Sequence, residues 1–155
     1  MGVKDDGYLV HLFVKEDRKL KFYPAHHKTS VVQKVRQKLR GEMIDLDFPP
    51  VFNNESRKGI VGRAVESGAI INQGNVRTDS DYIPFSDDVN SQLAVPIKHK
   101  NNIIGVINIE HNKLNAFDRE DEENLNTLAL YISIAQKNAD LYAEIRQRAG
   151  QYEVI

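Results

Sequence analysis

Alternating hydrophobic and polar positions at the start of the chain predict a β-hairpin. Residues 7–17 (GYLVHLFVKED) and 20–27 (LKFYPAHH) are rich in β-branched and aromatic residues, and a short charged turn at 15–19 lies between them. A helical pattern follows at 31–40 (VVQKVRQKLR), in which apolar side chains fall on one face before a terminating glycine. A proline pair at 49–50 interrupts the next segment, so we expect a short strand at 43–48 followed by a loop.

The pattern changes to a helical one at Gly59. Apolar residues face inward over the next two turns, and Gly68 stands where a left-handed residue ends a helix. Residues 69–72 (AIIN) then read as a strand. Residues 75–90 are rich in aspartate and contain only scattered apolar side chains, so we expect a long ordered loop with at most one helical turn. Loops of this length inside a compact domain are usually functional or disordered.

The clearest hairpin comes next. Residues 91–99 (SQLAVPIKH) and 103–111 (IIGVINIEH) flank a turn in which Asn101 and Asn102 suit positive φ angles. The two strands are apolar on both sides. This pattern predicts central strands with a covering layer on each face of the sheet, because a strand covered on one side only would alternate apolar and polar residues.

A long amphipathic helix is predicted over 118–149, with Asp118 as its cap. Its apolar side chains form two stripes on roughly opposite sides: Leu125, Leu128, Ile132, Ala135, Ala139 and Tyr142 make the first, and Leu130, Ile134, Leu141 and Ile145 make the second. The first stripe can pack on the sheet. The second requires another partner, for which a second copy of the chain is favoured over coverage by residues 8–48.

Composition narrows the classes of function. The 155 residues suit one domain, which we place at 1–155, and 41% hydrophobic with 28% charged residues is typical of a globular protein. A formal net charge of −1 argues against nucleic acid or an anionic membrane as partner, and no apolar run is long enough to span a bilayer. The chain has no cysteine, which excludes thiol catalysis, thiolate metal sites and a thioether-linked chromophore. A cytoplasmic location is expected.

Four blocks in this order resemble the GAF domain, a sensor and dimerisation module of signalling proteins. They are GIVGRAVESG from Gly59, the acidic loop with Asp79 and Asp81, SQLAVPI from Ser91, and GVINIE continuing into AFDREDEENLNTLA. The resemblance implies a GAF-like (profilin-like) α+β fold: a central antiparallel sheet of five or six strands, the long C-terminal helix on one face, and short helices and loops that form a ligand pocket on the other. No family block matches residues 28–56.

The resemblance also implies the residues that border a ligand. The helix that begins at Gly59 would line the pocket, the loop would supply an aromatic wall, and loop aspartates would accept hydrogen bonds from the ligand. These positions are Ile60, Val61, Tyr82, Phe85, Asp87 and Asp88. The aromatic residues are equally suited to anchoring the loop, and the aspartates to forming solvated turns.

The junction before the last helix is similar to the NK…F…DE pattern of GAF domains that bind cyclic nucleotides. Asn112 and Lys113 precede Phe117, and Asp121 follows. The resemblance implies a structural ion pair between Lys113 and Asp121, which would tie the last strand to the last helix. Acids and an aromatic residue also occur at this junction in family members without a nucleotide, so the pattern favours a structural role over cyclic-nucleotide binding.

Other chemistry finds little support in the residue pattern. Five histidines lack ligand spacing, so no metal site is expected, and no nucleophile lies in a recognisable motif. Glu110 shares a strand face with Asn108, and we interpret it as a wet, structural glutamate because it lies near the strand's end. We therefore expect no enzymatic activity and no identifiable cofactor.

The predicted function is a regulatory sensor that binds a small molecule non-covalently and transmits its state through the terminal helix to an output domain. The alternative is a ligand-free module that dimerises a larger protein. In that case Tyr82, Ile83 and Phe85 would fill the space beneath the loop.

Overall fold

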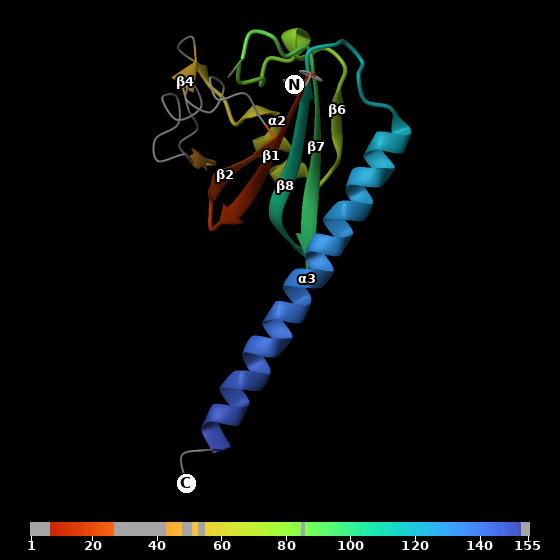
Figure 1. Ribbon diagram of the computed structural model, residues 1–155. Coiled ribbons are helices and arrows are strands. Elements are labelled where there is room, and N and C mark those ends of the chain that lie inside the picture. Colours follow the sequence, from red (N-terminus) through yellow and green to blue (C-terminus); the bar gives the residue numbers. More distant parts are fainter. Residues whose placement is uncertain (1–6, 27–42, 48–50, 53–54, 85, 153–155) are drawn as a thin grey trace, which may run out of the picture.

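The computed structural model describes residues 7–26, 43–47, 51–52, 55–84 and 86–152, and its centre is a six-stranded sheet (Figure 1). All its strand pairs are antiparallel, in the order β3-β2-β1-β8-β7-β6. The bounds are Tyr8–Glu16 (β1), Lys19–His26 (β2), Met43–Asp45 (β3), Ile71–Gln73 (β6), Ser91–His99 (β7) and Asn102–His111 (β8). Val51–Phe52 (β4) pairs separately with Glu55–Ser56 (β5). The predicted α+β class is confirmed.

Both predicted hairpins are present, and they lie side by side at the centre of the sheet because β1 pairs with β8. Gly105 permits this pairing: a Cβ at this position would lie 2.5 Å from the backbone oxygen of Phe13, closer than side-chain carbons ever approach. The expected positive φ at Asn101 and Asn102 is wrong, since Lys100 takes the left-handed conformation of the turn at φ 51°.

Each face of the sheet carries its own apolar cluster. On one face, side chains of β7 and β8 pack with Phe117 and with α3 (Arg119–Tyr152); Leu93 and Val95 are completely buried there. On the other face, α2 (Gly59–Ser67) packs over β7 and β8 together with Val76, Tyr82 and Ile83 of the 74–90 loop. The sheet is therefore covered on both sides, as the doubly apolar strands predict.

Helix α2 ends as its sequence predicts. Gly68 adopts φ +65°, and its N–H donates to the carbonyl oxygen of Ala64 at 2.9 Å. Gly68 is suited to this position because other residues rarely adopt left-handed angles without strain.

The predicted strand at 69–72 is β6, at 71–73, and the single predicted helical turn in the loop is the 3-10 helix η2 (Val76–Thr78). The predicted strand at 43–48 is shorter, and the predicted helix at 31–40 lies outside the described residues.

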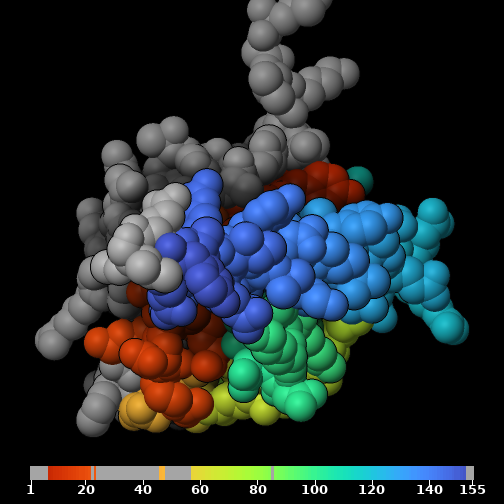
Figure 2. All heavy atoms as spheres, turned by 90° about the horizontal axis from the view of Figure 1, so that it is seen from below, coloured from red at the N-terminus to blue at the C-terminus, as the bar shows by residue number. Residues whose placement is uncertain are grey.

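Helix α3 has 34 residues, and its C-terminal part extends beyond the end of the sheet (Figure 1). In the view from that end it forms a continuous rod across the two hairpins (Figure 2). Its apolar contacts with the sheet are made through Leu125, Ala129 and Ile132, and further along Oδ2 of Asp140 lies 3.0 Å from Nε2 of His99 at the end of β7. The inward stripe predicted to reach Tyr142 is therefore too long. Leu128 is 45% exposed and Tyr142 is 69% exposed.

Candidate functional site

The 74–90 loop is held against α2 by one arginine. Arg63 donates from Nη2 to Asp79 Oδ2 at 2.6 Å and from Nη1 to Asp79 Oδ1 at 3.1 Å, and Nη1 also reaches Asp81 Oδ2 at 3.2 Å. Burial acts to raise the pKa of Asp79, but Arg63 and the backbone N–H of Asp81 outweigh it and hold the pKa below its ordinary value. The acidic loop residues thus have a structural partner that the sequence analysis did not identify.

A second arginine braces the loop internally. Arg77 donates to the carbonyl oxygen of Asp87 at 2.7 Å and to Oδ1 of Asn90 at 3.2 Å. The backbone of Asn90 in turn joins the loop to Val76 and to His111 of β8. The loop side chains Val76, Tyr82, Ile83 and Val89 are buried in the same apolar cluster as α2, so the described part of the loop covers the sheet beside α2.

The sheet beneath this cover carries a row of buried polar side chains. Nε2 of Gln92 on β7 donates to Oδ1 of Asn108 on β8 at 2.7 Å, and Nδ2 of Asn108 lies 3.4 Å from Nδ1 of His11 on β1. Glu110 follows Asn108 on the same face of β8 and lies directly opposite Gln92 in the register. All four are at most 4% exposed. We call His11, Gln92, Asn108 and Glu110 the polar row.

Glu110 is the charged member of the polar row. Desolvation raises its pKa to about 7, and Asn108 opposes the rise only in part. Among the described residues, no cation lies within ion-pair distance of its carboxylate. Its interpretation as a wet, structural glutamate is wrong, because the folded loop removes the strand's end from solvent.

Two further buried polar atoms near Glu110 have no hydrogen-bond partner, namely Oε1 of Gln92 and the hydroxyl of Tyr82. Burial raises the pKa of Tyr82 well above its usual range, and the nearby negative charge of Glu110 adds to the effect. Unpartnered buried polar groups cost free energy unless a ligand or water satisfies them. The polar row and Tyr82 therefore form the candidate site.

The ligand-bordering residues predicted from sequence divide between this site and the surface. Tyr82 lies over the polar row, while Ile60 and Val61 are buried where α2 packs on the same apolar cluster. Asp87 and Asp88 are exposed on the outer side of the loop, and their backbones bond to Arg77 and Ser86. Phe85 lies outside the described residues. Glu110 and Asn108 were predicted to share a strand face but not to belong to the site, and Gln92 was not among the predicted site residues.

The predicted ion pair between Lys113 and Asp121 is absent from the structure. Oδ2 of Asp121 accepts the N–H of Asp118 at 2.9 Å, and Oδ1 of Asp118 accepts the N–H of Asp121 at 3.0 Å. Lys113 is exposed, and its backbone contacts His111 and Ser91. The helix start thus uses Asp121 as one half of a reciprocal cap, which satisfies backbone donors that no earlier turn can reach.

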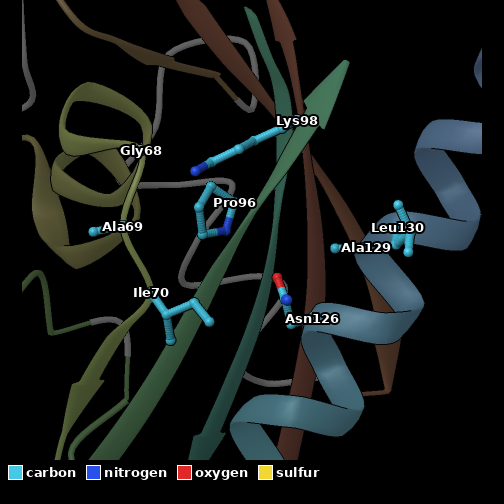
Figure 3. Close-up of a pocket in the computed structure, with 8 residues that line it drawn as sticks. All are labelled: Gly68, Ala69, Ile70, Pro96, Lys98, Asn126, Ala129 and Leu130. Carbon is cyan, nitrogen blue, oxygen red and sulfur yellow. The ribbon is translucent and has the colours of Figure 1, made fainter. Parts of the chain in front are cut away.

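A groove of about 520 Å³ opens elsewhere, at the edge of the sheet (Figure 3). Pro96 and Lys98 of β7 lie between the connection from α2 to β6 and helix α3. It is lined by Gly68, Ala69, Ile70, Pro96, Lys98, Asn126, Ala129 and Leu130. None of the five described ligand-bordering residues predicted from sequence lines this groove, and neither does any residue of the polar row, so the groove is distinct from the candidate site.

Within the described ranges, no three histidine or acidic side chains converge as metal ligands would. The same residues contain no helix with both the length and the apolarity needed to cross a bilayer.

Comparison with solved structures supports the fold and corrects one expectation. The GAF domain of a phosphoenolpyruvate-protein phosphotransferase from Coxiella burnetii aligns over 88% of this chain and 75% of its own, with a TM-score of 0.65 at 17% identity. A type II free methionine-R-sulfoxide reductase from Thermoplasma acidophilum aligns over 82% of this chain and 76% of its own, with a TM-score of 0.63 at 25% identity. Because that relative is an enzyme, the expectation of no enzymatic activity is contradicted. The absence of cysteine excludes thiol chemistry only.

Sequence comparisons identify the family. The probable 3′,5′-cyclic phosphodiesterase pde-5 of Caenorhabditis elegans is 30% identical over 105 residues, which cover 63% of this chain but only 14% of that protein. The family model described as GAF domain matches residues 12–135, and the chain therefore belongs to the GAF domain family.

Proposed function

We propose that this chain is a regulatory domain that binds a small molecule non-covalently between the 74–90 loop and the polar row. The observation that carries the proposal is the set of buried polar atoms without partners, Oε1 of Gln92 and the hydroxyl of Tyr82, beside a buried carboxylate. Small-molecule sites are mostly apolar with a few placed polar groups, which describes this face of the sheet. A cytoplasmic location accompanies the proposal.

Contacts at the end of the sheet offer a route from the site to α3. His111 follows Glu110 directly, and its ring packs edge-on against Tyr8 at 4.3 Å and near Phe117 at 6.4 Å between centroids. Nδ2 of Asn72 also donates to the carbonyl oxygen of Phe117 and to Glu122 of α3. A ligand that changes the end of β8 would thereby act on the start of α3, provided that it binds one arrangement of the helix more tightly than another.

The exposed side of α3 supports self-association as the output. Toward the C-terminal end of α3, residues that continue the inward direction are small or polar, such as Ala143 and Gln147. The opposite side of the helix carries large apolar side chains along most of its length. These are Leu130, Ile134, Leu141 and Ile145, which are 46% to 62% exposed. A second copy of the helix would cover them, and an output domain in a longer protein would receive the change.

One observation favours the alternative of a ligand-free dimerisation module. Tyr82 and Ile83 are 8% and 4% exposed and pack on the sheet, as that alternative requires. The two proposals differ in whether the loop opens. If the chain is a sensor, ligand binding displaces Tyr82 and changes the rate of hydrogen exchange across residues 76–90. If it is a ligand-free dimerisation module, no small molecule changes that rate.

Native mass spectrometry of the purified chain tests the proposal. We expect a dimer that carries extra mass, or a dimer that gains mass from a metabolite panel including cyclic nucleotides. Gln92→Leu should lose that mass and Asn126→Leu, in the separate groove, should keep it. A dimer to which nothing in the panel binds supports the ligand-free module instead, and a monomer contradicts self-association through α3.

A further inference from the structure

The chemistry of the candidate site restricts the ligand that fits it, if the proposed function holds. The polar row has one internal chain of donors, in which Gln92 donates to Asn108 and Asn108 approaches His11. Asn108 is also a hydrogen-bond donor to the Glu110 carboxylate, which has no cation partner among the described residues. Oε1 of Gln92 and the hydroxyl of Tyr82 have no hydrogen-bond partner. The site therefore lacks a positive charge beside Glu110 and a donor for Gln92.

The neighbouring cations are engaged elsewhere. Arg63 binds Asp79 and Asp81, Arg77 binds loop backbone and Asn90, and Nη1 of Arg57 donates to the carbonyl oxygen of Tyr82 at 3.1 Å. These contacts hold the loop, and the described part of the chain gives Glu110 no counter-charge. A buried carboxylate without a paired cation is rare, because desolvating the charge is costly.

We propose that the ligand beneath the 74–90 loop is an organic cation, whose protonated nitrogen binds Glu110 while its N–H groups satisfy Gln92 and Tyr82. Leu9, Ala94 and Val106 lie in the apolar cluster around the row and would contact the carbon portion. An anion would meet the Glu110 carboxylate with like charge. A neutral apolar ligand would leave Glu110 without a counter-charge, and Oε1 of Gln92 and the Tyr82 hydroxyl without partners. Leaving buried polar groups unpaired lowers affinity strongly.

Four probes of similar size test whether the ligand must be positively charged: butylammonium, butylguanidinium, butanol and butyrate. Each is added at about 10 mM, with the ionic strength matched between samples. We expect the two cations to raise Tm and to shift the amide resonances of Gln92, Asn108 and Glu110. Butanol and butyrate should do neither. Glu110→Gln should weaken cation binding at least about tenfold, since it removes the charge but keeps the shape. Glu123→Gln, at an exposed position on α3, should bind as the unchanged chain does.

The pH profile distinguishes Glu110 from its neighbours. Cation binding should strengthen roughly tenfold from pH 6 to pH 8 as the carboxyl ionises. In the described part of the chain, the titratable or charged groups facing the row are His11 from β1 and Tyr82 from the loop, with Arg77 and Asp87 on the loop's outer side. Glu110→Gln should remove most of the pH dependence of cation binding. If His11 were the main cause of that dependence, it would remain in the variant.

Each result decides between the two proposals. Binding of butanol or butyrate as tight as that of the cations, absence of binding by either cation, or full cation binding by Glu110→Gln overturns the cation inference. In these cases the proposed function survives if another compound of the metabolite panel binds and Gln92→Leu abolishes it. If no compound of any charge binds beneath the loop, the proposed function itself fails.

Discussion

The two faces of the sheet differ in whether their buried polar side chains have hydrogen-bond partners. Under α3, the side chains of β7 and β8 form an apolar layer in which Leu93 and Val95 are completely buried. The buried polar residues at its end, Ser91 and His111, both have hydrogen-bond partners. Under α2 and the 74–90 loop, an apolar cluster of similar depth is crossed by the polar row, part of which lacks partners. Burying polar atoms without partners lowers stability. The first face therefore contributes stability, and the second gives up some stability where the polar row lacks partners.

The largest effect is expected on the apolar face. Leu93→Ala removes a completely buried side chain between the sheet and α3, so the free energy of unfolding should fall by about 2 to 5 kcal/mol. Urea denaturation measures this change. Leu114→Ala is the matched control, since Leu114 is 54% exposed and its truncation should change stability by less than about 0.5 kcal/mol. Equal effects of the two substitutions would contradict the assignment of this face.

A charge change on the other face should act in the opposite direction. The pKa of Glu110 in the folded chain is about 7, above its ordinary value of 4.5, so the folded state holds the proton more tightly than the unfolded state. Stability is then greatest below about pH 4.5 and is lost as pH rises through 7, by an amount on the order of 3 kcal/mol. Glu110→Gln should stabilise the ligand-free chain at pH 8, and hardly at all at pH 4.5.

Urea midpoints at several pH values between 4.5 and 8 give the measurement. Glu123→Gln serves as control, because the side chain of Glu123 is 66% exposed and its removal should leave the pH profile of stability unchanged. A Glu110→Gln variant that is less stable than the unchanged chain at pH 8 would show that the carboxylate has a favourable partner in the folded state.

Loosening the loop is expected to have an intermediate effect. Arg63→Ala leaves Asp79, whose side chain is 7% exposed, without its guanidinium partner. Stability should fall by about 1 to 2 kcal/mol, a reduced value because the Arg63 side chain is 37% exposed and solvent screens the pair. Hydrogen exchange at Tyr82 and Ile83 should accelerate, while exchange on β7 stays slow.

Arg119→Ala breaks a comparable pair with Glu123 on the surface of α3, where the arginine is 90% exposed. It should change neither stability nor exchange measurably. If Arg63→Ala behaves in the same way, the contact with Asp79 and Asp81 does not hold the loop in place.

Local patterns predicted most of the fold correctly. Both hairpins, α2 with its Gly68 cap and the start of α3 at Asp118 depend on residues close in sequence, where periodicity and capping chemistry operate. The extent of the inward stripe on α3 was overestimated, because it depends on where the sheet ends. That boundary is set by strand pairing across the whole chain.

The candidate site was predicted only in part, for the same physical reason. Tyr82 and Glu110 were recognised as residues of interest, but Glu110 was interpreted as solvated because nothing in the local sequence shows that the loop covers it. Arg63 carried a usable signal, being the one charge inside the apolar first turns of α2 and followed by an acidic loop. The signal from the exposed Asp87 and Asp88 was misleading, because an aspartate that forms a turn cannot be distinguished in sequence from one that binds a ligand.

The smallest effect is expected at Tyr82. Tyr82→Phe removes a buried hydroxyl that has no hydrogen-bond partner and retains the ring that packs on the sheet. Removing an unsatisfied polar group without changing shape is neutral or stabilising, so the free energy of unfolding should rise by between zero and about 1 kcal/mol. Urea denaturation at pH 6 and pH 8 measures the change, with Tyr131→Phe on the exposed side of α3 as control. A loss of more than about 1 kcal/mol would mean that the hydroxyl is satisfied in the folded chain, and that the face under the loop is as complete as the face under α3.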